Sequence, residues 1–167
     1  MTNTPDNALA LAGFTLAHAT WSVSDLPDDE LLVPLAIVDR GEQRELVRFE
    51  ADTQEDAISE GKHAMAEGND ATAWAFAREG ALRLQAGGEQ QDALVVDFWA
   101  EGMEHPLTLI QPFERYTRHG RFRVVGDMLI SSGGEVLDST SAEKVIEGIN
   151  EGVREHPTVA ELWRTWL

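Results

Sequence analysis

The chain has 167 residues, 43% of them hydrophobic, and a formal net charge of −17. This length predicts one domain, residues 1–167, with enough apolar side chains for a core of its own. The charge argues against binding to nucleic acid or an anionic membrane, and the absence of cysteine excludes disulfides, thiolate catalysis and iron–sulfur clusters.

The start of the chain leads us to expect a cytoplasmic protein. Residues 1–7 contain no Lys or Arg and include Asp6, unlike the positive n-region of a signal peptide. The apolar residues 8–19 are too few to span a bilayer. We therefore expect no membrane segment.

The first predicted element is a helix that begins after Asp6 or Asn7 and runs to about Thr20, because Ala and Leu dominate this stretch. A helix apolar on both sides is deeply buried or shared with a second subunit. One side of this helix carries Leu9, Ala12 and Leu16, and the other carries Leu11, Phe14, His18 and Trp21. Residues 14–23 could instead form a strand, and both interpretations stay open.

A β-hairpin is predicted next, because the apolar run 31–38 is followed by a turn and by residues 45–51, which can pair back with it. Pro34 cannot donate to a ladder, so its strand is expected at an edge or with a bulge. A second helix follows, with Thr53 or Asp52 as its cap and Gly68 at its end.

The rest of the chain predicts strands and then helices. Four strand-like runs occupy residues 71–84, 92–101, 107–113 and 121–130, and their short links favour antiparallel pairing. A helix then begins at a capping-box pattern, Thr140 with Glu143, and His156-Pro157 separates it from a last helix.

Together these elements predict an α+β fold. Its single, mostly antiparallel sheet of about five or six strands is packed against helices, the N- and C-terminal ones included.

Basic charge concentrates at one place in this acidic chain: Arg115, Arg118, Arg121 and Arg123. Guanidinium groups bind phosphate and carboxylate with paired hydrogen bonds. Asp97 and Glu101 would share one strand face and could complete a site for an anion or a metal. The alternative, which we favour, is that these arginines neutralise acidic side chains across the sheet.

Four aromatic or histidine side chains are candidates for an interface: His18, Trp21, Trp163 and Trp166. Tryptophan is enriched at the centres of protein interfaces. The first and last helices also carry more apolar surface than one modest sheet readily covers, which favours a homodimer. The alternative is that the last helix simply docks on the core of its own chain.

No catalytic motif is recognisable, so we predict no cofactor and assign no metal ligands. The first hypothesis is a non-enzymatic binding or interaction module, homodimeric, whose acidic surface meets a basic protein. The second is a small-molecule-binding protein or enzyme that uses the region from Arg115 to Arg123 with Asp97 or Glu101. The third is a purely structural role in a larger assembly.

Overall fold

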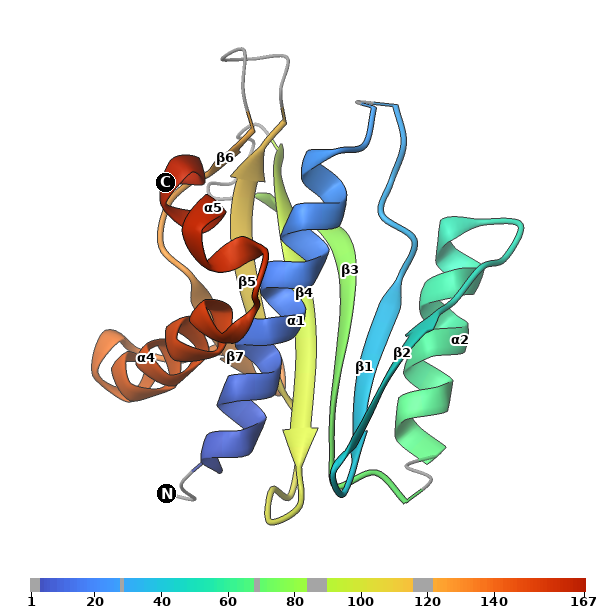
Figure 1. Ribbon diagram of the computed structural model, residues 1–167, viewed down its shortest axis with the longest axis vertical. Helices are drawn as coiled ribbons and strands as arrows, with labels where there is room; N and C mark the ends of the chain where they lie inside the picture. Colours follow the sequence, from blue (N-terminus) through green and yellow to red (C-terminus); the bar gives the residue numbers. More distant parts are fainter. Residues whose placement is uncertain (1–3, 28, 68–69, 84–89, 116–121) are drawn as a thin grey trace.

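The computed structural model describes residues 4–27, 29–67, 70–83, 90–115 and 122–167. One sheet lies between two layers of helix (Figure 1). The helices are α1 (Asp6–Ser24), α2 (Gln54–Glu67), α4 (Ser139–Glu155) and α5 (Val159–Trp166). The strands are β1 (Leu35–Arg40), β2 (Gln43–Arg48), β3 (Ala73–Arg83), β4 (Gln90–Ala100), β5 (Leu107–Glu114), β6 (Arg123–Val124), β7 (Leu129–Ser132) and β8 (Glu135–Val136).

The sheet is antiparallel throughout, in the order β2-β1-β3-β4-β5-β7-β8, with β6 pairing to β5 off this path. The predicted α+β class and the flanking terminal helices are confirmed, but the sheet has eight strands instead of five or six. The prediction of one strand over residues 121–130 is wrong. Gly126 adopts a positive φ of 72°, which breaks the extended chain between β6 and β7.

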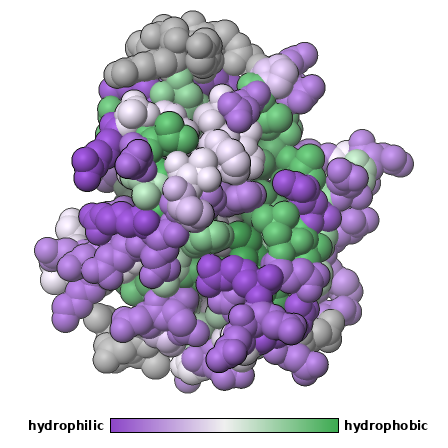
Figure 2. Space-filling model, in the orientation of Figure 1, coloured by the Kyte–Doolittle hydropathy of each residue, from purple (hydrophilic) through white to green (hydrophobic). Residues whose placement is uncertain are grey.

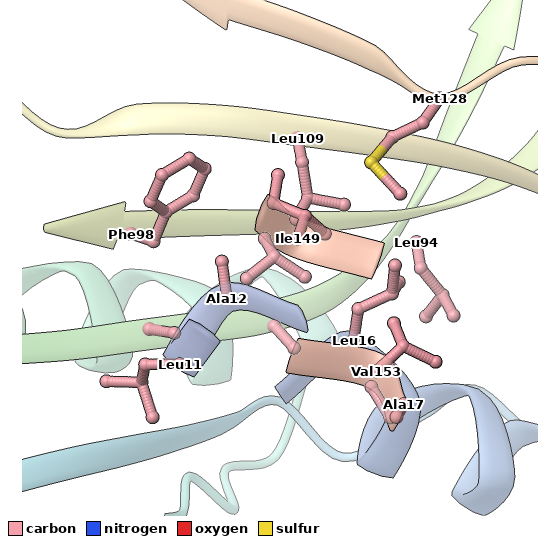
Figure 3. Close-up of a cluster of buried hydrophobic side chains, with 14 of the residues drawn as sticks. Leu11, Ala12, Leu16, Ala17, Leu94, Phe98, Leu109, Met128, Ile149 and Val153 are labelled. Atoms are coloured by element: carbon pink, nitrogen blue, oxygen red, sulfur yellow. The ribbon is translucent and has the colours of Figure 1, made fainter. Parts of the chain in front are cut away.

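Helix α1 continues to Ser24, so the interpretation of residues 14–23 as a strand is wrong. It is apolar on both sides because it has neighbours on both: β3 and β4 on one side, α4 on the other (Figure 1). Figure 3 shows Leu11, Ala12 and Leu16 of α1 lying among side chains from the sheet and from α4. Both Leu11 and Leu16 are fully buried.

Glycines let α1 and α4 cross with their backbones nearly touching. A Cβ at Gly13 would lie 1.9 Å from the carbonyl oxygen of Ile149, and a Cβ at Gly152 would lie 2.3 Å from that of Ala10. The apolar surface from which the homodimer was inferred is thus covered within one chain. That observation no longer argues for a second subunit.

The predicted hairpin is confirmed, with β2 pairing residue by residue against β1. The expectation that its first strand lies at an edge is wrong, because β1 sits between β2 and β3. Pro34 precedes the strand and uses its carbonyl group to accept a hydrogen bond from the Phe49 N–H at 2.9 Å. The edge strand is β2.

The second helix is capped as predicted, since Thr53 Oγ1 accepts a hydrogen bond from the Asp56 N–H at 3.1 Å. Gly68, its predicted end, lies outside the described residues. The capping box at Thr140 is wrong. Asp138 caps α4 by accepting from the Ser141 N–H at 2.8 Å, so the helix begins two residues earlier than predicted, at Ser139.

The two faces of the sheet are filled differently. Alternate residues of β3 pack with α1, whereas Trp74 and Phe76 form a smaller cluster under α2 with Ala36 and Val38 of β1. Because side chains alternate between the two faces along each strand, a candidate site residue can contact only residues on its own face. Within the described part of the chain, no helix has the length and apolar character needed to cross a membrane.

Candidate functional site

The structure brings Arg115 and Arg123 to the same end of the sheet. Arg115 follows directly after β5, and Arg123 in β6 is the register partner of Glu114, the last residue of β5. Arg118 and Arg121 lie outside the described residues. The guanidinium group of Arg115 also lies over the ring of Phe113, 5.5 Å from its centre.

Arg115 is neutralised within the chain. It forms a buried ion pair with Glu79 of β3, and its Nε lies 3.9 Å from Oδ2 of Asp92 on β4. The side chains of Glu79 and Arg115 are 6% and 13% exposed. Burial raises the pKa of Glu79, and the positive charge of Arg115 only partly offsets this effect. The geometry at Arg115 agrees with the alternative in which the arginines balance acidic groups of the sheet.

Two guanidinium nitrogens at this end nevertheless have no hydrogen-bond partner among the described residues. Nη1 of Arg115 and Nε of Arg123 are buried and unsatisfied. Burying such a donor without a partner is costly, so each could be satisfied by an anion. The two lie on different faces, however: Arg115 lies with Phe113, whereas Arg123 shares the face of Glu114. These two nitrogens are the strongest sign of a small-ligand site among the described residues.

Asp97 lies on the other face of the sheet and does not join Arg115. It accepts hydrogen bonds from Arg78 Nη1 at 2.8 Å and from Thr108 Oγ1 at 2.6 Å. Glu101 is exposed in the turn after β4. Because Leu94 and Val96 pack against α1, the odd-numbered Asp97 must point away from it. The structure therefore does not assemble the predicted combination of Arg115 with Asp97 and Glu101.

Two histidines meet beneath the interface candidate Trp21. Nδ1 of His18 on α1 lies 3.3 Å from Nε2 of His156, the residue between α4 and α5. Phe14 and Trp21 surround the pair, with ring centres 4.9 and 6.0 Å from that of His156. Sequence analysis singled out His18 but treated His156 only as part of a helix break.

The hydrogen bonds fix the tautomers of both rings. Nδ1 of His156 accepts from the backbone N–H groups of Thr158 and Val159, at 3.3 and 3.2 Å. His156 therefore carries its proton on Nε2 and donates it to Nδ1 of His18. That leaves the proton of His18 on Nε2, which is buried without a partner among the described residues. Neither ring can gain a second proton without losing one of these hydrogen bonds.

We predict that acid weakens the fold through this pair. Burial lowers the pKa of both histidines below 6.5, and the nearby charges of His156 and Arg48 lower that of His18 further. The unfolded chain then binds more protons than the folded chain once the pH falls below 6.5, so stability present above that pH is lost on acidification. Urea unfolding of the wild type and of His18→Phe should diverge below that pH, the variant losing less. Parallel pH profiles would contradict the prediction.

The C-terminal tryptophans hold α5 on its own chain. Trp166 is 8% exposed, and its ring packs edge-on against Phe122 at 5.5 Å. Trp163 is half-buried against the main core and contacts Trp166. The structure therefore accounts for both residues as docking contacts of the last helix.

A different surface combines α1 with the edge strand, and we name it the α1–β2 surface: Phe14, His18 and Trp21 of α1 with Arg44, Leu46 and Arg48 of β2. Leu46 is the partner of Ile37 and Arg48 that of Leu35, so they share the face that α1 covers. The guanidinium of Arg44 lies 4.9 Å from the ring centre of Phe14.

Two further hollows lie at α2, and one of them, of about 400 Å³, is open and polar and is lined by Ala51, Asp52, Asp56, Ser59 and Glu60. The other, of about 130 Å³ between α2 and the hairpin, is lined mainly by apolar side chains: Val38, Arg40, Val47, Phe49, Ala64, Met65, Ala71 and Trp74. In the part of the chain that the structure describes, no three His, Asp or Glu side chains gather as a metal site. No family model, curated protein or solved structure matches the chain.

Proposed function

We propose that the chain is a non-enzymatic interaction module that binds a basic protein through α2. The outer face of this helix carries the proposal. Ala57 and Gly61 are buried toward the sheet, while four acidic side chains stand exposed on the helix: Glu55, Asp56, Glu60 and Glu67. Such a face attracts positive charge and speeds encounter with a basic partner.

The engagement of the internal ionisable groups supports this proposal over an enzymatic one. Asp97 is held by Arg78 and Thr108, and Glu79 is held by Arg115. The two histidines hold each other. Groups committed in this way are occupied by contacts within the fold, whereas catalysis needs a group free to exchange a proton with a substrate.

A pair of charge variants tests the acidic face. Glu55, Glu60 and Glu67 are changed to Gln and Asp56 to Asn, and the immobilised variant is compared with wild type for binding of basic proteins from a lysate at low and high salt. We expect wild type to retain a basic protein at low salt only, and the variant to lose it. The control changes four exposed glutamates outside α2 to Gln, Glu104, Glu135, Glu143 and Glu147, which alters net charge equally and should keep binding. Equal retention by both variants would contradict the proposal.

We also propose that the module is a homodimer. Three of the five large apolar side chains that are well exposed among the described residues lie in or beside the hairpin: Leu31, Val33 and Leu46. The apolar side chains of β1 itself are buried, and Figure 2 shows hydrophobic residues exposed between hydrophilic ones on this face of the molecule. Exposed apolar patches of this kind mark interaction sites.

A second candidate function rests on the unsatisfied Nε of Arg123. Here the chain would bind a small phosphate or carboxylate at that end of the sheet. Inorganic phosphate at about 100 times its dissociation constant would add roughly 2.7 kcal/mol of stability, several degrees of melting shift. The shift should vanish in Arg123→Ala and persist in Arg164→Ala, which changes an exposed arginine of α5. A shift unchanged in Arg123→Ala would remove this candidate.

A further inference from the structure

The α1–β2 surface is apolar in its middle and basic on one flank. Phe14 and Trp21 are half-buried, and Leu46 is 38% exposed. On the β2 side, Arg44 is bound by Asp39, whereas Arg48 makes no ion pair within the described residues. Four other exposed cations also make no ion pair among the described residues, Lys62, Lys144, Arg154 and Arg164, so what distinguishes Arg48 is its place on this surface.

The opposite flank is acidic. Helix α4 lies on the other side of α1 from the hairpin (Figure 1). Its glutamates recur at every fourth position and all are exposed: Glu143, Glu147, Glu151 and Glu155. The hydrogen bond from Arg44 to Asp39 is the main cause that raises the pKa of Arg44, and the charge of Glu155 adds to it, which places the last of these glutamates near Arg44. One face of the molecule therefore runs from basic, through apolar, to acidic.

We infer that this face packs against the same face of a second copy of the chain, related by a two-fold axis that passes near α1. The inference rests on the proposed homodimer and names its interface. A two-fold axis that lies in the interface, parallel to α1, brings the two faces together and opposes unlike flanks, so Arg44 and Arg48 of each subunit meet Glu151 and Glu155 of the other. The same operation places Leu46 and Trp21 against apolar side chains of the partner and removes them from water.

This arrangement has a consequence for the acidic helix α2. It packs against the opposite face of the sheet from α1 (Figure 1). Dimerisation through the α1–β2 surface thus leaves both copies of α2 exposed. A basic protein can then bind each subunit of the dimer.

Charge reversal tests the interface by mass in solution. Alone, Arg48→Glu places like charges opposite Glu151, and Glu151→Arg places like charges opposite Arg48. We expect each variant to dimerise about tenfold or more weakly than wild type, as measured by sedimentation velocity at low salt. Mixing the two variants should restore dimers, because both contacts then join opposite charges. Lys62→Glu on α2 changes net charge as Arg48→Glu does and should leave the dimer intact.

The outcomes separate the interface from the dimer itself. If wild type stays at 18.4 kDa at every concentration, the proposed homodimer fails and this interface with it. If wild type dimerises but Arg48→Glu and Glu151→Arg dimerise equally well, the homodimer stands and this interface is overturned. Circular dichroism of each variant confirms folding, and Leu46→Asp provides a second disruption that does not depend on the choice of charged pair.

Discussion

Replacing Gly13 by Ala is expected to lower the free energy of unfolding by about 3 kcal/mol, although Ala is the better helix former by about 1 kcal/mol. The added Cβ would lie 1.9 Å from the carbonyl oxygen of Ile149 and 2.7 Å from the backbone nitrogen of Val153. Neither atom can rotate away, so α1 and α4 must separate. Separation opens voids around Ile149, which is fully buried. Urea unfolding followed by tryptophan fluorescence measures the loss.

A matched glycine in the same helix pair provides the control. A Cβ at Gly148 would meet only the side chain of Leu9, with its Cδ1 2.5 Å away. That side chain can partly rotate, so Gly148→Ala should cost less than Gly13→Ala. A midpoint for Gly13→Ala equal to or above that of wild type would show that α1 and α4 are not this close.

Replacing Arg115 by Met is expected to cost about 3 to 5 kcal/mol, because it leaves the carboxylate of Glu79 buried without its counter-charge. The side chain of Glu79 is 6% exposed and cannot regain full hydration in place. Its Oε2 keeps the hydrogen bond from the Leu32 N–H, at 3.2 Å, but the carboxylate loses the guanidinium. Chemical unfolding at neutral pH measures this effect.

The double variant Glu79→Met with Arg115→Met separates the value of the pair from the cost of breaking it. Burial raises the pKa of Glu79, so the charged form is held less favourably in the folded chain than in the unfolded one. The stability that this carboxyl contributes is present below pH 4.5 and is lost as the pH rises through its raised pKa. The double variant should therefore be about as stable as wild type. A double variant as unstable as Arg115→Met would show that the pair itself stabilises the fold.

The sequence predicts which face of the sheet each side chain joins better than it predicts where helices and strands end. Alternation in residues 73–77 correctly separates Trp74 and Phe76 from the alanines that pack under α1. The two-sided apolar pattern of α1 allows both burial and a second subunit, and only the position of α4 decides between them. Gly148 and Gly152, one turn apart, were the available signal for that close helix pair, and it was missed. The break at Gly126 depends on a backbone angle that periodicity does not report.

The candidate site was harder to predict because it depends on register. Asp97 lies in β4, and Arg115 directly follows β5, the neighbouring strand. Because successive side chains of a strand point to opposite faces, these two residues lie on opposite sides of the sheet. Their partners, Arg78 and Glu79, are neighbours in β3 that point to those two faces. The sequence shows that Arg78 and Glu79 carry opposite charges next to each other. The partner that each side chain binds can be known only from the register in which β3 pairs with β4. His156 pairs with His18 across 138 residues, a separation no local pattern bridges.

Hydrogen exchange of the wild-type chain at low and high concentration tests most directly whether this protein works through its surfaces. The amides of edge strand β2, Gln43–Arg48, have no further strand beside them and should exchange readily in the dilute chain. We predict that peptides covering β2 become protected at high concentration, while those covering α2 do not change. Identical exchange at both concentrations, or protection confined to the β7–β8 edge, would contradict the account.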